Sequence, residues 1–276
     1  MSESPAWTSE ELETDPHTRA DKARKVRDMF TAIARSYDLN NRLHSFGRDQ
    51  AWRRKAVRLA ELRGIERVLD VACGTGDLTL AFRDAMAKLN QDHEDVIGLD
   101  FTYEMLPHAV HKSRWWNQTK LQSADLELMP GVRYLNGDAL ALPFADASFD
   151  VISIAFGLRN VADPAAAVAE FTRVLRPGGR LVILEFSEPS NPLLRFGSKL
   201  YTERIMPWTA TWIARDRSGA YRYLPRSVAT FLDRAGVSGL LETAGLRVGR
   251  VRPVSFGVAT IYVATRAVDP ASPSRA

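Results

Sequence analysis

One turn of the chain holds the residues whose types and spacing are most suited to binding a ligand. An apolar run that ends at Val71 leads, two residues later, into Gly74 and Gly76, and a helical pattern follows from Leu78. Glycine lets the backbone turn sharply and approach a ligand closely, and the first turn of a helix presents free N–H groups. The turn therefore predicts a site for a nucleotide-like ligand, with Gly74 and Gly76 in contact with it.

The acids beside this turn distinguish between two kinds of ligand. A dinucleotide site has the spacing G-x-G-x-x-G, but Thr79 stands where the third glycine would be. Asp70 and Asp77 would repel a pyrophosphate, whereas they suit a ligand that carries an ammonium group and a sulfonium cation. We therefore expect S-adenosylmethionine as the cofactor and Asp70 among its contacts, although Asp77 also fits a helix N-cap.

Two further acids follow later strands. Asp100 ends the run from Val96, where a carboxylate can accept hydrogen bonds from both ribose hydroxyls of an adenosine. An ordinary aspartate at a strand end is the alternative. After the next strand, Asp138 is placed to bind the adenine amino group, and Ala139 can supply a backbone N–H. Together these spacings predict an adenosyl pocket.

The elements that must position these residues alternate between short β-rich runs and helical runs. Because each return to a parallel strand needs a crossover helix, this order predicts a Rossmann-like α/β fold: a doubly wound, mostly parallel seven-stranded sheet with an antiparallel last strand. We expect a helix near 227–244 and a purely structural turn at 176–180. The expected strands are 67–72, 96–100, 132–136, 149–155, 180–186, 247–253 and 258–265.

The chain divides into one domain and two tails. Residues 1–21 and 267–276 are rich in Ser, Pro, Glu and Asp without apolar periodicity, so we expect them to be disordered. Residues 22–266 form the expected domain, in which 22–63 is an N-terminal helical cap and 192–223 is an inserted helical lid.

Composition excludes several classes of protein. The single cysteine, Cys73, excludes an internal disulfide and a zinc cluster built on cysteines, and His44 has no metal-ligand spacing with the other histidines. We therefore expect no metal site. No apolar stretch is long enough to cross a bilayer, so we expect a cytoplasmic protein. Part of the net charge of +4 lies at 53–58, which could bind nucleic acid or lipid head groups but more simply forms a solvated helix face.

Several further segments resemble one family, the ubiquinone/menaquinone biosynthesis C-methyltransferases, over roughly residues 26–265. The resemblance implies a class I methyltransferase that uses S-adenosylmethionine to methylate a ring carbon of a prenylated quinol, most simply demethylmenaquinol. The benzoquinol intermediate of ubiquinone biosynthesis is the alternative substrate. The segments that carry the resemblance are Ala34–Asp38, Asn41, Ser45–Gly47, Phe156–Val161, Leu184–Ser187 and Tyr221–Leu224.

The resemblance also implies particular site residues. Its cofactor contacts fall on Thr75, Asp100, Asp138 and Ala139. Ala155 stands at a further contact position that is often serine in the family, so only its backbone could contact the cofactor here. The histidine that usually lies in the last strand is absent from 255–262, a departure that affects the substrate end more than the cofactor end.

Methylation of a ring carbon requires a quinol that is losing its hydroxyl proton. Arg159 follows the fourth strand and could hold the quinol oxygen as an anion, but a guanidinium is too weakly acidic to serve as the base. Asp38 or a water is the better base, and Asn160 and Tyr37 could orient the ring. A structural salt bridge is the alternative role for Arg159, and core packing is the alternative for Tyr37.

Partners and rival functions follow from the same residues. Trp208 and Trp212 could form the apolar face of a lid that admits a prenyl tail or rests on a membrane surface, or they could pack in the core. A homodimer is one candidate assembly. A nucleic-acid methyltransferase is disfavoured, because the chain lacks an Asn- or Asp-Pro-Pro-aromatic motif and its only cysteine lies in the cofactor turn. A small-molecule methyltransferase and a non-catalytic cofactor-binding protein are the other rivals.

Overall fold

The computed structural model describes residues 5–89, 95–120, 132–200 and 219–268. Its strands are β1 Arg67–Val71, β2 Asp95–Asp100, β3 Val132–Asn136, β4 Phe149–Ala155, β5 Leu175–Phe186, β6 Leu246–Val254 and β7 Ala259–Arg266. Its α-helices are α1 Lys22–Ile33, α2 Tyr37–His44, α3 Arg48–Leu59, α4 Asp77–Leu89, α5 Leu106–Lys120, α6 Pro164–Val174, α7 Pro192–Leu200, α9 Ala220–Thr230 and α10 Arg234–Thr243.

The strands form one 7-stranded sheet in the order β3-β2-β1-β4-β5-β7-β6. Strands β1 to β5 pair in parallel, and β7 pairs antiparallel with both β5 and β6. The chain order therefore reverses between β1 and β4, which is the switch point where open α/β sheets bind ligands. The predicted Rossmann-like fold with an antiparallel last strand is confirmed.

Alternating side chains of the strands build a separate core on each face of the sheet. Leu69 and Ile152 pack on one face with α6 and α10, while their neighbours Val68 and Val151 pack on the other face with α3 and α4. Successive side chains of a strand point to opposite faces, so strands covered on both sides must be apolar throughout. Helix α6 has a local cause as well, because Asp163 caps its N-terminus by accepting hydrogen bonds from two backbone N–H groups.

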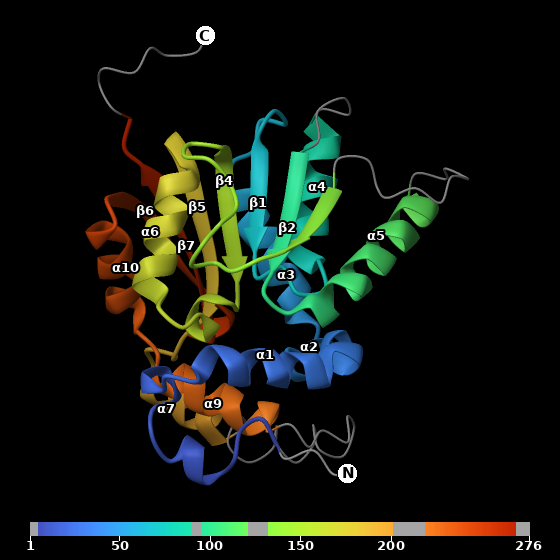
Figure 1. Cartoon of the computed structure of the whole chain (residues 1–276). Coiled ribbons are helices and arrows are strands. Elements are labelled where there is room, and N and C mark those ends of the chain that lie inside the picture. The colour runs from blue at the N-terminus through green and yellow to red at the C-terminus, as the bar shows by residue number, and fades with distance from the viewer. Residues whose placement is uncertain (1–4, 90–94, 121–131, 201–218, 269–276) are drawn as a thin grey trace.

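The remaining helices gather at one end of the sheet. Helices α1 and α2 lie across the end where the parallel strands finish, and α7 and α9 lie on the far side of α1 (Figure 1). Helix α1 contacts both α9 and the short helix η5, Leu158–Asn160, that follows β4. This end of the sheet is the one that carries the predicted site.

The cap is smaller than residues 22–63. Helix α3 packs on the face of the sheet, where Trp52, Ala56 and Val57 are buried in the second core. Because α3 packs against α4 and β5, only α1, α2 and the short helix between them, among residues 22–63, form a cap over the strand ends.

The prediction of a disordered tail is wrong for residues 5–21. This segment contains two short 3-10 helices, η1 Glu10–Leu12 and η2 Pro16–Thr18, and Trp7 and Leu12 join an apolar cluster with residues of α1 and α9. A short acidic segment with only two large apolar anchors has no periodicity that would reveal such packing. Residues 1–4 and 269–276 lie outside the described residues, so disorder there stays a prediction.

Two other boundaries differ from the prediction. The expected helix at 227–244 is two helices, because Asp233 accepts a hydrogen bond from Gly236 N and caps a new helix, α10. The expected turn at 176–180 lies inside β5. Leu175 and Arg180, five positions apart, pair with Phe149 and Val151, which are two positions apart on β4, so residues 176–179 form a bulge. Of the expected lid, α7 and the start of α9 are described, while Trp208 and Trp212 lie outside the described residues.

Candidate cofactor and substrate pocket

A cavity lies at the carboxyl ends of β1, β2 and β4, beneath α1. We name Gly74, Asp100 and the segment 137–140 that follows β3 the polar end of its lining. We name Tyr37, Asn160 and an apolar wall that includes Val26, Phe30 and Phe156 the other end. The two ends adjoin, because a Cβ on Gly74 would lie 3.8 Å from the ring of Tyr37, so one cavity offers polar groups beside a wall suited to an apolar ring.

The glycine turn shapes the first end. Ala72, Gly74 and Gly76 all have left-handed backbone angles, with φ of 51°, 56° and 82°. A Cβ on Gly76 would lie 2.6 Å from the hydroxyl oxygen of Tyr134, so glycine is required there by space as well as by angle. The turn thus places the backbone of Gly74 against the cavity, whereas Gly76 is buried beside Tyr134 and does not line it.

Asp100 is the most defined polar group of the cavity. Its Oδ2 accepts a hydrogen bond from Gly74 N at 2.7 Å, and its Oδ1 accepts one from Thr102 N at 2.7 Å. Burial raises the pKa of this carboxyl to about 6, against the backbone hydrogen bonds, which lower it. Each carboxylate oxygen has a second lone pair, so two acceptor positions are held rigidly at the cavity, which fits the two hydroxyls of a ribose.

The segment after β3 completes this end. Gly137 N donates to the carbonyl oxygen of Asp100 at 3.0 Å, which draws residues 137–139 toward the end of β2. Asp138 uses Oδ1 to accept from Leu140 N at 2.9 Å and is only partly buried, so its second oxygen can face a ligand. Asp138, Ala139 and Ala155 all line the cavity, as a site for an adenosyl group requires.

Asp70 does not line the cavity, although the sequence predicts it as a cofactor contact. Its carboxylate points into the protein, where it accepts hydrogen bonds from Thr79 Oγ1 at 2.6 Å and from Ser153 Oγ at 2.7 Å. Burial raises its pKa to about 6. Asp70 therefore ties β1 to α4 and β4 beneath the turn, and direct contact with an ammonium group is not what the structure shows.

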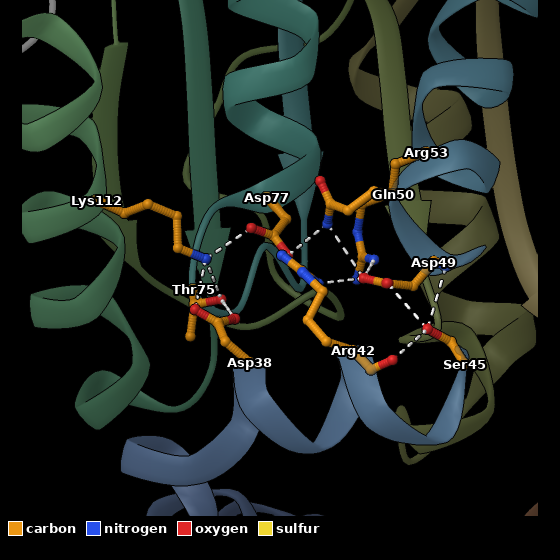
Figure 2. A network of polar contacts seen from close by, with 9 residues as sticks. All are labelled: Asp38, Arg42, Ser45, Asp49, Gln50, Arg53, Thr75, Asp77 and Lys112. Carbon is orange, nitrogen blue, oxygen red and sulfur yellow. Dashed lines mark hydrogen bonds and ion pairs between the residues drawn. The ribbon is translucent and has the colours of Figure 1, made fainter. Parts of the chain in front are cut away.

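Asp77 is neutralised by cations of the protein itself (Figure 2). Its Oδ1 lies 2.6 Å from Lys112 Nζ on α5, and its Oδ2 lies 2.8 Å from Arg42 Nη2 on α2. Burial opposes ionisation, but the positive charges of Lys112 and Arg53 lower the pKa of Asp77 below its usual range. The acid that the sequence assigned to a cationic ligand therefore pairs with α2 and α5.

Thr75 and Asp38 belong to the same network and lie outside the cavity lining (Figure 2). Thr75 Oγ1 donates to Asp38 Oδ1 at 2.6 Å, and Lys112 Nζ lies 2.7 Å from Asp38 Oδ2. Arg42 also pairs with Asp49, which lies 2.7 Å from Arg53 on α3. These contacts fasten α2 to the glycine turn, and they direct the Asp38 carboxylate to Thr75 and Lys112.

Arg159 lies behind the cavity wall. Its Nη1 donates to the carbonyl oxygen of Phe156 at 2.6 Å and to Glu185 Oε1 at 2.7 Å, and its backbone N–H donates to Glu185 Oε2 at 3.2 Å. The guanidinium also lies over the ring of Phe186. The structural salt bridge is thus the role that the structure shows for Arg159.

Asn160 and Tyr37 do line the cavity. Asn160 Nδ2 donates to the carbonyl oxygen of Phe156 at 3.1 Å, and burial raises the pKa of Tyr37, so its hydroxyl stays protonated. Of the four predicted catalytic residues, the structure brings these two into the cavity and leaves Arg159 and Asp38 outside its lining.

Sequence reasoning missed Glu185 and Lys22. Glu185 interrupts the apolar run of β5, and a charge within such a run is the signal of a buried carboxylate that needs a partner. Lys22 is buried beside Val161, whose carbonyl accepts from its ammonium, and burial lowers its pKa to about 8. Nothing in the pattern of the first helix distinguishes Lys22 from the other basic residues of α1.

The chain is similar to known proteins over most of its length. A model of the ubiE/COQ5 methyltransferase family matches residues 18–266. The chain belongs to this family. A Thermus thermophilus protein named demethylmenaquinone methyltransferase is 44% identical over 238 residues, which are 86% of this chain and 100% of that protein. A Teredinibacter turnerae protein named ubiquinone/menaquinone biosynthesis C-methyltransferase UbiE is 38% identical over 248 residues, 90% of this chain and 94% of that protein.

Solved structures of methyltransferases share the fold of this methyltransferase at low sequence identity. One from Thermotoga maritima, described as a possible histamine N-methyltransferase, has a TM-score of 0.57 at 18% identity and covers 87% of this chain and 99% of that chain. The [4+2]-cyclase SpnF has a TM-score of 0.62 at 16% identity, covering 90% and 97%. Because a cyclase shares the architecture, the family match and not the fold identifies the methyltransferase.

Within residues 5–89, 95–120, 132–200 and 219–268, no helix is both long and apolar enough to cross a bilayer.

Proposed function

We propose that this methyltransferase transfers a methyl group from S-adenosylmethionine to a ring carbon of a prenylated quinol, with demethylmenaquinol as the substrate. The observation that carries the proposal is the single cavity, whose lining brings Asp100, Asp138 and Gly74 together with Tyr37 and Asn160. The Thermus thermophilus relative, at 44% identity, is named for demethylmenaquinone, which supports the naphthoquinol over the benzoquinol.

The residues of the polar end fit an adenosyl group. Asp100 would accept the two ribose hydroxyls, Asp138 would accept from the adenine amino group, and the backbone of Ala139 and Ala155 would flank the base. Gly74 allows the close approach that the methionine portion needs. Bound there, S-adenosylmethionine supplies the methyl group as a sulfonium.

The residues at the other end would position the quinol. Asn160 keeps one N–H and one oxygen lone pair beyond the bonds described, and the Tyr37 hydroxyl is held protonated, so both can bind quinol oxygens. The apolar wall of Val26, Phe30 and Phe156 excludes water from the ring, which strengthens those polar contacts.

Loss of the hydroxyl proton turns the quinol into a strong carbon nucleophile. Two protons leave the quinol, one from the hydroxyl before attack and one from the ring carbon after the new C–CH3 bond has formed. We assign both to water, because Asp38 is paired with Lys112 and lies outside the lining. Arg159 is neutralised by Glu185 behind Phe156, so we assign it the positioning of the short helix that carries Asn160 and not the stabilisation of the quinol anion.

Purified protein, S-adenosylmethionine and a short-chain demethylmenaquinol test the proposal by mass spectrometry. We expect a product heavier by one methyl group, and slower turnover of a benzoquinol in a competition assay. Methylation of RNA or of small phenols without any methylation of quinol would contradict it. Contact with a membrane surface, a homodimer and a cytoplasmic location stay predictions.

A further inference from the structure

Residues 5–17 lie before the span that the family model matches, which begins at residue 18, yet they are packed into the molecule. We name them the N-terminal strap. Trp7 is completely buried, and it is one of the largest fully buried side chains in the described residues. This segment lies outside the span that the family model matches, yet it buries a tryptophan, so we ask what the strap does for the rest of the molecule.

The strap is bound to two helices. It holds α9 through a hydrogen bond of 2.9 Å between His17 Nε2 and the carbonyl oxygen of Ser227, and through Arg226 Nη2, which donates to the carbonyl oxygen of Glu13 at 3.0 Å. It holds α1 through Lys25, whose Nζ lies 2.8 Å from Glu11 Oε1. The strap therefore joins α9 to α1, the helix that covers the cavity.

Trp7 stacks on Tyr223 of α9, with ring centroids 4.7 Å apart and planes 23° from parallel. Gly219, the N-cap of α9, makes room for this contact. Its φ is 86°, and a Cβ there would lie 2.4 Å from the carbonyl oxygen of Trp7. The start of α9 is thus shaped around the strap.

Tyr223 connects the strap to the cavity. Its hydroxyl donates to Asn160 Oδ1 at 3.1 Å, and burial raises its pKa to about 12, so the donor is retained at neutral pH. Asn160 Nδ2 donates to the carbonyl oxygen of Phe156. These two bonds fix which atom of the Asn160 amide is nitrogen and which is oxygen, and so fix what the amide offers to a ligand.

The strap also supports the apolar wall. Trp7 belongs to the same buried cluster as Val26, and Phe30 and Tyr37 pack against that cluster. All three of these partners line the cavity. Trp7 therefore lies behind the apolar wall, although no strap residue itself lines the cavity. In the described part of the chain, the strap residues are not among the hydrogen-bond partners of Asp100 or Asp138.

We propose that Trp7, acting through Tyr223, is a positioning residue that orients the Asn160 amide toward the quinol, so that the N-terminal strap tunes quinol binding without affecting the cofactor end. The proposal rests on the proposed function for the identity of the ligand at Asn160. Its structural basis is the chain of contacts Trp7–Tyr223–Asn160.

Three variants separate positioning from general stability. Trp7→Ala removes the stack, Trp7→Phe keeps an aromatic ring, and Glu10→Gln changes an exposed residue of the strap. Within the described residues the indole N–H of Trp7 has no hydrogen-bond partner, so Trp7→Phe loses no hydrogen bond. We expect Trp7→Ala to raise KM for the quinol about fivefold to tenfold, the range of one lost aromatic pair, and the other two variants to stay within about twofold.

Calorimetry of S-adenosylmethionine binding is the second readout. We expect its Kd to change by less than about twofold in all three variants. A general loss of structure would instead weaken the binding of both ligands. Tyr223→Phe, which keeps the stack and removes the hydroxyl, should raise KM for the quinol as Trp7→Ala does, and the double variant should add little. Equal losses at both ligands, or additive losses in the double variant, would overturn the proposal.

Hydrogen exchange distinguishes failure of the proposed function from failure of this inference. The N–H of Asn160 donates to the carbonyl oxygen of Gly157 at 2.9 Å within η5. We expect faster exchange of this N–H in Trp7→Ala but not in Trp7→Phe or Glu10→Gln. If the wild-type protein methylates no quinol, that exchange pattern still supports positioning of Asn160 by the strap. If the exchange pattern is not seen, positioning by the strap is rejected.

Discussion

Arg159 Nη1 lies 2.7 Å from Glu185 Oε1, and both side chains are almost completely buried at the carboxyl ends of neighbouring strands. Glu185 also accepts from the backbone N–H groups of Arg159 and Phe186. The pair therefore joins the end of β5 to the short helix that carries Asn160. Such a buried ion pair keeps the short helix in place against β5, because each buried charge costs free energy when its partner moves away.

Breaking this pair should destabilise the protein strongly. We expect Glu185→Gln and Arg159→Met each to lower the free energy of unfolding by about 3 to 5 kcal/mol, and the double variant Arg159→Met/Glu185→Met to cost less than the sum. Urea denaturation of the four proteins measures the coupling. Additive losses would show that the two side chains do not depend on each other.

Cofactor binding should depend on the ionisation of Asp100. Burial raises the pKa of this carboxyl to about 6, and only the ionised form offers acceptors to both ribose hydroxyls. We expect S-adenosylmethionine to bind about tenfold more weakly at pH 5 than at pH 7, as the carboxylate becomes protonated. Calorimetry from pH 5 to 8 measures this.

Asp100→Asn should weaken binding and flatten that profile, whereas Asp95→Asn, at the other end of β2, should keep it. A Kd that is independent of pH would reject Asp100 as an ionised contact.

The effect of pH on the stability of the protein has the opposite sign. Because the pKa of folded Asp100 lies above the unfolded value of about 4, its contribution to stability is greatest below pH 4 and is lost as pH rises through 6.

Deprotonation of Lys22 should make the protein more stable at pH 10 than at pH 8. Burial lowers its pKa to about 8, below the unfolded value of about 10.4, so the unfolded chain binds more protons in this window. The free energy of unfolding should therefore rise between pH 8 and 10, by on the order of 1 to 3 kcal/mol. In Lys22→Met this rise should vanish, while Lys88→Met, at an exposed position, should retain it.

The Asp77 network should stabilise the glycine turn. Asp77→Asn removes the charge that Lys112 and Arg42 share, and we expect it to lower the free energy of unfolding by about 1 to 3 kcal/mol. Asp84→Asn, which breaks the exposed pair with Lys88 on the same helix, should cost far less.

The difference between wild type and Asp77→Asn should also depend on pH. The cations lower the pKa of Asp77 in the folded protein, so its contribution is present above about pH 4, the unfolded value, and is lost as pH falls through the lower folded pKa. Acid titration of both proteins, followed by circular dichroism, measures this. A constant difference down to the lowest pH would contradict the network.

Local pattern was sufficient for most of the fold. The strand Phe149–Ala155 has the bounds that its apolar run predicts, because a strand covered on both faces needs continuous apolar residues. The edge strand Val132–Asn136 also has its expected bounds, although most of its side chains are exposed or half-buried. Alternation of strands and helices was enough to place Asp100 and Asp138 in one cavity, since parallel strands bring their carboxyl ends to the same edge. Both predictions use only residue type and order.

The direction of a side chain and the identity of a distant partner were decided by the tertiary structure alone. Asp70 turns inward to two hydroxyls, and Asp77 meets cations from α2 and α5, although both acids flank the glycine turn in the sequence. Arg159 meets Glu185, and Trp7 finds Tyr223. The sequence by itself determined the sheet, the glycine turn and the acids at the strand ends, because these depend on short-range periodicity and backbone freedom. Which of those acids remain available to a ligand depends on charges and rings brought from far along the chain, and only packing in three dimensions decides that.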